Sequence, residues 1–139
     1  MSDAVLRSTE GRIGILTVNN PPVNALAAAV RNGIKEGIEA FGADPNIDAI
    51  VLIGSGRTFI AGADIREFGK PRTGAKLNDV IATMENCPKI VVAALHGNPA
   101  FRADLETARR EVAAARAAGP KPDPAACARE AEIVAKSPY

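Results

Sequence analysis

The sequence has few of the residues that build metal centres or disulfide frameworks. His96 is its single histidine, which argues against a His-based metal site. The two cysteines, Cys87 and Cys127, lie in apolar helical patterns and lack the CxxC spacing of a redox or zinc motif. We therefore expect both cysteines to be buried thiols, and we expect no bound metal.

Long apolar runs and a strong excess of one charge are also missing. No run approaches the roughly 20 apolar residues that a membrane-spanning helix needs. The net charge of +1 argues against nucleic acid or an anionic membrane as the main partner. The N-terminus lacks the basic-then-apolar pattern of a secretory signal, and Ser137-Pro138-Tyr139 is not a peroxisomal address. These features predict a cytoplasmic protein.

The patterns that are present alternate between strands and helices. With 139 residues, 47% of them apolar, the chain can form one domain with or without an appendage. Apolar runs at 4–8 and 13–18 flank a Glu-Gly turn and predict a β-hairpin. Apolar positions at three- and four-residue steps predict amphipathic helices over 26–41 and 77–84, and 90–95 reads as a buried strand. This order predicts an α/β layer with parallel strand pairing.

The stretch 49–68, AIVLIGSGRTFIAGADIREF, organises the rest of the chain. Its first five residues predict a strand buried on both faces, and Ile65 to Phe68 is a short helical pattern. A strand that runs through a glycine-containing loop into a helix start leaves backbone N–H groups unpaired, and such groups can hold an anion or a developing oxyanion. Gly62 lets the backbone approach a ligand closely, and Ala63 places a small side chain and an N–H beside it.

Three motifs resemble those of the crotonase (enoyl-CoA hydratase/isomerase) family and occur in the family's order. GRTFIAGADIREF at 56–68 is similar to the first signature of that family. NNPPVNAL at 19–26 and PKIVVAALHG at 88–97 match the same family. The likeness covers about residues 3–97. It is greatest to the hydratase half of multifunctional fatty-acid β-oxidation enzymes.

The resemblance implies an α/β fold in which ββα units wind into a spiral, with residues 1–97 as the N-terminal part of a crotonase-like domain. Residues 98–139 form a different segment, because 13 of its 42 residues are alanine and Asn98-Pro99 and Asp123-Pro124 are good helix starts. We expect an alanine-rich helical hairpin there that docks on something larger. Crotonases often form trimers, so the resemblance also implies a homo-oligomer.

The resemblance further implies an acyl-CoA or enoyl-CoA thioester as substrate, with coenzyme A as part of the substrate and no separate cofactor. In the family, two N–H donors hold the thioester oxygen, and the first is the residue after Gly in the Ala-Gly-x-Asp motif. That residue is Ala63 here. Coenzyme A lies against this loop and the loop after the first hairpin. The implied binding residues are Asn24, Ala25, Leu26, Ala61, Gly62, Asp64 and Ile65.

The second half of that site departs from the family pattern. A Gly-Gly-Gly loop with the second N–H donor is expected shortly after His96-Gly97, followed by two catalytic glutamates. The sequence instead reads Asn98-Pro99-Ala100-Phe101. The predicted strand therefore joins directly to a helical segment, as in a chain truncated internally. By resemblance, both catalytic glutamates and the second oxyanion donor are missing.

Two carboxylates near the loop, Asp64 and Glu67, are candidates for substitute acid–base groups. We favour structural roles for both, with Asp64 capping the following helix and Glu67 a solvated helix residue. His96 at a strand end is a candidate base, and here too a structural role is favoured.

The basic residues near the motifs leave two interpretations open. Lys70 and Arg72 either meet the phosphates of coenzyme A or belong to a solvated loop, while Lys89 is expected to be structural or on the surface. A dinucleotide site at 54–56 is disfavoured, because the full GxGxxG pattern is absent.

Two functions remain. The first is an enoyl-CoA hydratase-like protein of fatty acyl-CoA β-oxidation that retains one oxyanion donor. The second is a catalytically inactive chain that binds a CoA thioester or a partner protein. Loss of the enone absorbance of crotonyl-CoA separates the two.

Overall fold

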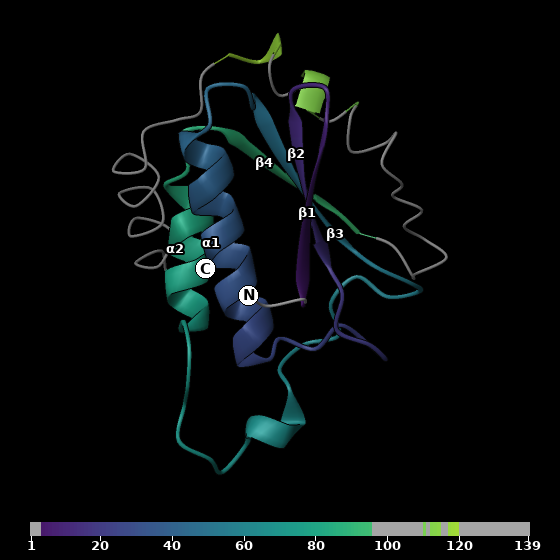
Figure 1. Cartoon of the computed structure of the whole chain (residues 1–139), viewed down its shortest axis with the longest axis vertical. Coiled ribbons are helices and arrows are strands. Elements are labelled where there is room, and N and C mark those ends of the chain that lie inside the picture. The colour runs from purple at the N-terminus through teal and green to yellow at the C-terminus, as the bar shows by residue number, and fades with distance from the viewer. Residues whose placement is uncertain (1–3, 96–109, 111, 115–116, 120–139) are drawn as a thin grey trace, which may run out of the picture.

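The chain forms a sheet covered on one face by two helices (Figure 1). The computed structural model describes residues 4–95, 110, 112–114 and 117–119. The elements within them are β1 (Val5–Glu10), β2 (Ile13–Val18), α1 (Ala28–Ala43), β3 (Ala49–Gly54), the 3-10 turn η1 (Ile65–Glu67), α2 (Leu77–Glu85) and β4 (Ile90–Ala94). The predicted α/β class and element order are confirmed.

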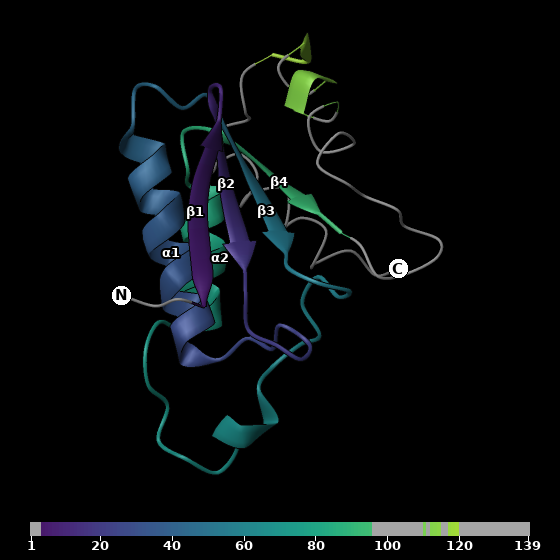
Figure 2. The same cartoon turned by 45° about the vertical axis from the view of Figure 1, so that its right-hand side comes forward.

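The four strands lie in the order β1-β2-β3-β4. β1 and β2 form the predicted antiparallel hairpin, with Val5 opposite Val18. β2, β3 and β4 are mutually parallel, with Ala49 opposite both Ile13 and Ile90. Parallel strands end at the same edge of a sheet. The chain segments that follow β2 and β3 therefore leave the sheet side by side, as Figure 2 shows.

The main core lies between the sheet and the two helices, which run next to each other on one face (Figures 1 and 2). Its most deeply buried large side chains are Leu16, Val18, Val30, Ile34, Ile38, Ile50 and Val80. Two glycines let α1 approach the sheet closely. A Cβ on Gly33 would lie 2.8 Å from the Val5 Cβ, and one on Gly37 would overlap the Leu16 Cδ2. The close contact of α1 with the hairpin therefore depends on these two positions lacking a side chain.

The opposite face of the sheet carries a smaller apolar cluster. Ala49, Val51 and Ala94 are buried there together with Val112. Val112 belongs to a helical stretch in the part of the chain predicted to be an alanine-rich hairpin. Most of the predicted hairpin, including Cys127, lies outside the described residues. Val112 therefore packs against the second face of the sheet.

Two details differ from the sequence-based expectations. β4 was expected to be a buried strand, but Ile90 to Val92 are only half-buried and Ala93 is exposed. The reason is that β4 is the last strand in the described sheet and pairs with β3 alone. In addition, α1 begins at Ala28 rather than Leu26, because Leu26 forms a bridge with Ala63 instead.

Candidate functional site

The loop after β3 turns back sharply over the end of the sheet. A Cβ on Gly54 would overlap the carbonyl oxygen of Phe59, so only glycine fits where the returning chain crosses the strand. The loop then pairs with the segment that precedes α1. The Leu26 amide donates to the Gly62 carbonyl at 2.8 Å, and Leu26 and Ala63 form a parallel bridge. Two predicted binding segments, 24–26 and 61–65, are thus in direct contact.

The buried residue Asn24 holds these two segments together through hydrogen bonds of its side chain. The residue is 3% exposed and its φ is 53°. The Asn24 amide group donates to the carbonyls of Ser55 and Thr58, at 2.9 and 2.7 Å, and its oxygen accepts from the Asn20 amide. All of these bonds are internal. The structure therefore places the Asn24 side chain between the two loops, where it holds them together.

Asp64 forms the cap of η1, as predicted. Its carboxylate accepts from the Arg66 amide at 2.9 Å and from the Arg66 guanidinium at 2.7 Å. These bonds to Arg66 lower the pKa of Asp64 from 3.8 to about 2. Asp64 is therefore ionised at neutral pH and engaged on both oxygens, which does not suit it to donate a proton.

Glu67 does not behave as a solvated helix residue, and that prediction is wrong. One carboxylate oxygen accepts from the Ala28 amide at 2.7 Å, and the other pairs with the Arg31 guanidinium at 2.9 Å. The Ala28 bond, followed by the Arg31 bond, lowers the pKa of Glu67. The expectation failed because both partners lie more than 35 residues away in the sequence.

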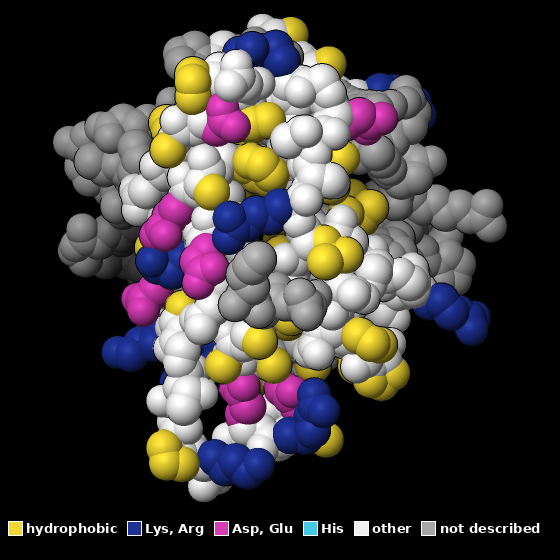
Figure 3. Space-filling view, in the orientation of Figure 1, with side chains coloured by type: hydrophobic (Ala, Val, Ile, Leu, Met, Phe, Trp, Pro, Cys, Tyr) yellow, Lys and Arg dark blue, Asp and Glu magenta, His cyan; other side chains and the backbone are white. Residues whose placement is uncertain are grey.

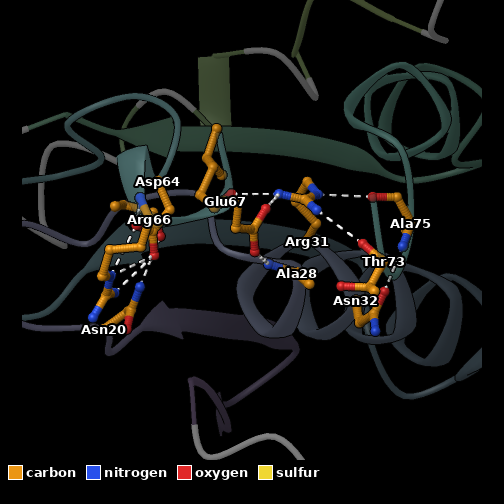
Figure 4. Close-up of polar contacts among 11 residues, drawn as sticks. Asn20, Ala28, Arg31, Asn32, Asp64, Arg66, Glu67, Thr73 and Ala75 are labelled. Carbon is orange, nitrogen blue, oxygen red and sulfur yellow. Dashed lines mark hydrogen bonds and ion pairs between the residues drawn. The ribbon is translucent and has the colours of Figure 1, made fainter. Parts of the chain in front are cut away.

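Arg31 connects three chain segments at the first turn of α1 (Figure 4). Besides Glu67, its guanidinium donates to the carbonyls of Leu26, Thr73 and Ala75, at 2.6, 3.0 and 2.8 Å. Asn32 adds a further bond, accepting from the Ala75 amide at 2.7 Å. The segment after η1 is thereby held against the start of α1.

These segments enclose a cavity of about 360 Å³. Figure 3 shows acidic and basic side chains around a hollow at the lower end of the molecule, where Figure 1 places η1 and the loop after it. The lining residues are Leu26, Arg31, Gly62, Ala63, Asp64, Glu67, Phe68 and the run 72–77. Four of the eight predicted site residues, Leu26, Gly62, Ala63 and Asp64, thus line one cavity. Asn24, Ala25, Ala61 and Ile65 do not.

The Ala63 amide nitrogen takes part in none of the hydrogen bonds formed among the described residues. Its neighbours are engaged, since the Gly62 carbonyl accepts from Leu26 and the Ala61 amide donates to the Val23 carbonyl. A backbone donor that has no acceptor in the described part of the chain and lies in the wall of a cavity is suited to bind a carbonyl oxygen or an anion.

The basic residues divide between structural and cavity positions. Arg72 and Lys76 line the cavity, and both are exposed. Lys70 does not line it. Lys89 donates to the carbonyls of Phe41 and Asp44 at the end of α1, which confirms its predicted structural role. Sequence reasoning missed Lys76 and Arg31, because neither belongs to a motif.

Other predicted features can be placed only in part. Cys87 is a buried thiol, as predicted, whereas His96 lies outside the described residues. The described residues contain no group of three His, Cys, Asp or Glu side chains placed to hold a metal ion. Neither helix in this part of the chain has the length and apolar character needed to cross a bilayer.

Comparison with known proteins identifies the family. The profile of the enoyl-CoA hydratase/isomerase family matches residues 8–101. The human peroxisomal bifunctional enzyme is 42% identical over 97 residues, which cover 69% of this chain and 13% of that protein. A probable enoyl-CoA hydratase from Rhizobium meliloti is 38% identical over 100 residues, covering 68% of this chain and 39% of that protein.

A solved structure agrees with these sequence matches. The crystal structure of an enoyl-CoA hydratase/carnithine racemase from Magnetospirillum magneticum superposes with a TM-score of 0.62 at 33% identity. It covers 68% of this chain and 39% of the other. The chain therefore spans well under half the length of these relatives. The predicted resemblance is confirmed, and the chain belongs to the enoyl-CoA hydratase/isomerase family.

Proposed function

We propose that this chain is an enoyl-CoA hydratase-like protein of fatty acyl-CoA β-oxidation that binds a CoA thioester through the Ala63 amide. The observation that carries the proposal is the Ala63 nitrogen, which has no acceptor among the described residues and lies in the cavity wall. In such a site the N–H would donate to the thioester carbonyl oxygen. That bond would strengthen as the oxygen gains negative charge during addition of water.

Arg72 and Lys76 support the same ligand class. Both are basic, exposed and part of the lining of the cavity that Ala63 also lines. Their charges suit the phosphates of coenzyme A, which would lie towards solvent while the thioester lies deeper. We therefore retain Arg72 from the earlier prediction and add Lys76 in place of Lys70.

Catalysis needs more than one donor. The family pattern predicts a second N–H donor after Gly97 and two glutamates, and the sequence there reads Asn98-Pro99-Ala100-Phe101. Loss of one oxyanion donor costs about 10²–10³ in rate, and loss of acid–base groups costs about 10²–10⁴. Asp64 and Glu67 do not replace them, because both are ionised and bound to protein groups. We propose binding with little or no turnover by the chain as it stands.

The proposal is tested with two ligands that differ only in the thioester carbonyl, which is a methylene group in the second ligand. Butyryl-CoA carries the thioester carbonyl, and S-butyl-CoA is the corresponding thioether without it. One net hydrogen bond is worth about 0.5–1.5 kcal/mol, so titration calorimetry should show butyryl-CoA binding roughly three- to tenfold more tightly. Equal affinities, or no binding of either ligand, would contradict the proposal.

Turnover is measured separately with crotonyl-CoA. We expect its enone absorbance to decay at the rate seen in buffer. Faster decay would show a working acid–base pair and would favour the catalytic hypothesis over the inactive binding module.

We also propose self-association. Ile65 and Phe68, on and beside η1, are 78% and 70% exposed, which is high for large apolar side chains. Burial of these residues between copies of the chain would remove apolar surface from water. Sedimentation velocity should show an oligomer, and a monomer at all concentrations would refute the proposed self-association.

Two further expectations remain predictions. They are the cytoplasmic location of the protein and the presence of coenzyme A as part of the substrate rather than as a separate cofactor.

A further inference from the structure

The helix α1 begins without a cap of its own. Ala27 occupies the capping position, makes no side-chain hydrogen bond there, and is followed by a first turn without an acidic residue. The first N–H groups of a helix have no partner inside the helix. Glu67 provides one, accepting from the Ala28 amide across 39 residues of sequence. The cap of α1 therefore comes from the loop that carries Ala63.

The second oxygen of Glu67 strengthens this link. It pairs with Arg31, whose side chain is only 13% exposed and which also donates to the Leu26 carbonyl. Figure 4 shows the Glu67 carboxylate lying between Ala28 and the Arg31 guanidinium. One side chain thus contacts two positions of α1, Ala28 and Arg31, that lie about one helical turn apart. Such a two-point contact restricts both the distance and the orientation of η1 relative to the helix.

Ala63 lies between this contact and a second one. On its N-terminal side the Gly62 carbonyl is bonded to the Leu26 amide. On its C-terminal side the Glu67 amide closes η1 on the Asp64 carbonyl at 3.1 Å, and the Glu67 side chain reaches Ala28. The short segment 62–67 is therefore attached to the start of α1 at both ends. Loss of the Glu67 attachment would leave the Ala63 peptide held to the start of α1 by its backbone bridge with Leu26 alone.

We propose that Glu67 is a positioning residue for the Ala63 amide. It fixes η1 on α1 and so holds the Ala63 N–H in the direction that meets a thioester carbonyl. This inference rests on the proposed function, because it assigns to Glu67 the orientation of the same donor. Glu67 does not touch the ligand carbonyl and exchanges no proton with it.

The inference is tested by the affinity ratio of butyryl-CoA to S-butyl-CoA in three variants. The two ligands share the whole coenzyme, so the ratio reports only on the carbonyl contact. In Glu67→Ala we expect the ratio to fall from the wild-type value to within about twofold of one. S-butyl-CoA affinity should change less than about threefold.

A double variant separates positioning from helix stability. In Ala27→Ser/Glu67→Ala the serine supplies a local cap to α1, because serine is among the preferred residues at that position. We expect this variant to regain much of the thermal stability lost in Glu67→Ala while its affinity ratio stays low. If Glu67→Ala alone folds poorly, the affinity ratio can still be measured in the double variant.

The matched control is Glu39→Ala. Glu39 is the partner of Lys35 in an ion pair of 2.6 Å within α1, away from the Ala63 cavity. The control loses the same side chain and one ion pair, and its ratio should equal that of the wild type. A folded Glu67→Ala or double variant that keeps the wild-type ratio would overturn the inference. A wild-type ratio of one would instead refute the proposed function itself, before any variant is compared.

Discussion

The layer between α1 and the sheet is packed from apolar side chains, whereas the segment from 55 to 76 is held mainly by polar bonds. In the layer, Leu16, Ile34 and Ile50 are almost fully buried. In the loop segment, Ile65 and Phe68 face solvent, and the attachments are made by Asn24, Arg31, Asn32 and Glu67. Apolar packing is spread over many contacts, while each polar attachment is a single group. We therefore expect substitutions in the layer to reduce global stability and substitutions in the attachments to alter the site.

The largest effect is expected for Leu16→Ala. Leu16 is completely buried between β2 and α1, so the change should cost about 2–5 kcal/mol of unfolding free energy. Urea denaturation measures this directly. Leu6→Ala is the control, since Leu6 is 47% exposed and the same truncation there removes less buried area than at Leu16. Equal losses in the two variants would show that the layer is not the stabilising core.

The second prediction concerns the close approach of α1 to the sheet. Gly37→Ala would overlap Leu16, and such overpacking should cost about 1–3 kcal/mol despite the better helix propensity of alanine. Gly42→Ala is the matched control in the same helix, because its Cβ would meet the Cys87 Sγ at an ordinary 3.5 Å. Denaturation midpoints should fall for Gly37→Ala and hold or rise for Gly42→Ala. A reversed order would contradict the packing described for α1.

Asn24→Ala tests the polar attachments. It removes two donors from the Ser55 and Thr58 carbonyls, which are partly buried. We expect a loss of about 1–2 kcal/mol, since an unpaired polar group costs about 1–3 kcal/mol and these carbonyls can recover some bonding to water. The affinity ratio of butyryl-CoA to S-butyl-CoA should also fall. Asn78→Ala, on an exposed position of α2, should change neither quantity. If Asn24→Ala loses stability but keeps the wild-type affinity ratio of butyryl-CoA to S-butyl-CoA, Asn24 does not contribute to the geometry of the site.

The smallest effect is expected in the acid range. The pKa of Asp64 is about 2 in the folded chain, below its ordinary 3.8, because Arg66 stabilises the carboxylate. Its contribution to stability is therefore complete above about pH 4. It is lost as the pH falls from there towards 2. The thermal midpoint of Asp64→Asn should fall less steeply than that of the wild type across this window. Asp79→Asn serves as the exposed control, and parallel curves for all three proteins would refute the Asp64–Arg66 assignment.

Much of the fold followed from local patterns. The run of β-branched residues at 49–53 predicted β3, and the spacing of apolar residues predicted α1 and α2, because burial on one face imposes these periods. The Asp64 cap was also predictable, since its partner Arg66 is two residues away. These features depend on neighbours in the sequence, so a single chain is enough to recognise them.

The rest depends on residues that are distant in sequence. Glu67 bonds Ala28 and Arg31 only after β3 and the loop bring η1 to the start of α1. No local pattern marks that pairing, and Arg31 resembles any charged residue on an exposed helix face. The half-burial of β4 likewise depends on which strands flank it, which its own apolar run does not specify.

The most direct test of the account is the Ala63 amide proton in ¹⁵N-resolved NMR spectra of the wild-type chain. If this N–H binds the thioester oxygen, butyryl-CoA should move its proton resonance downfield, and S-butyl-CoA at equal saturation should leave it near its unbound position. If both ligands bind and the Ala63 resonance responds equally to each, or to neither, the central claim is contradicted.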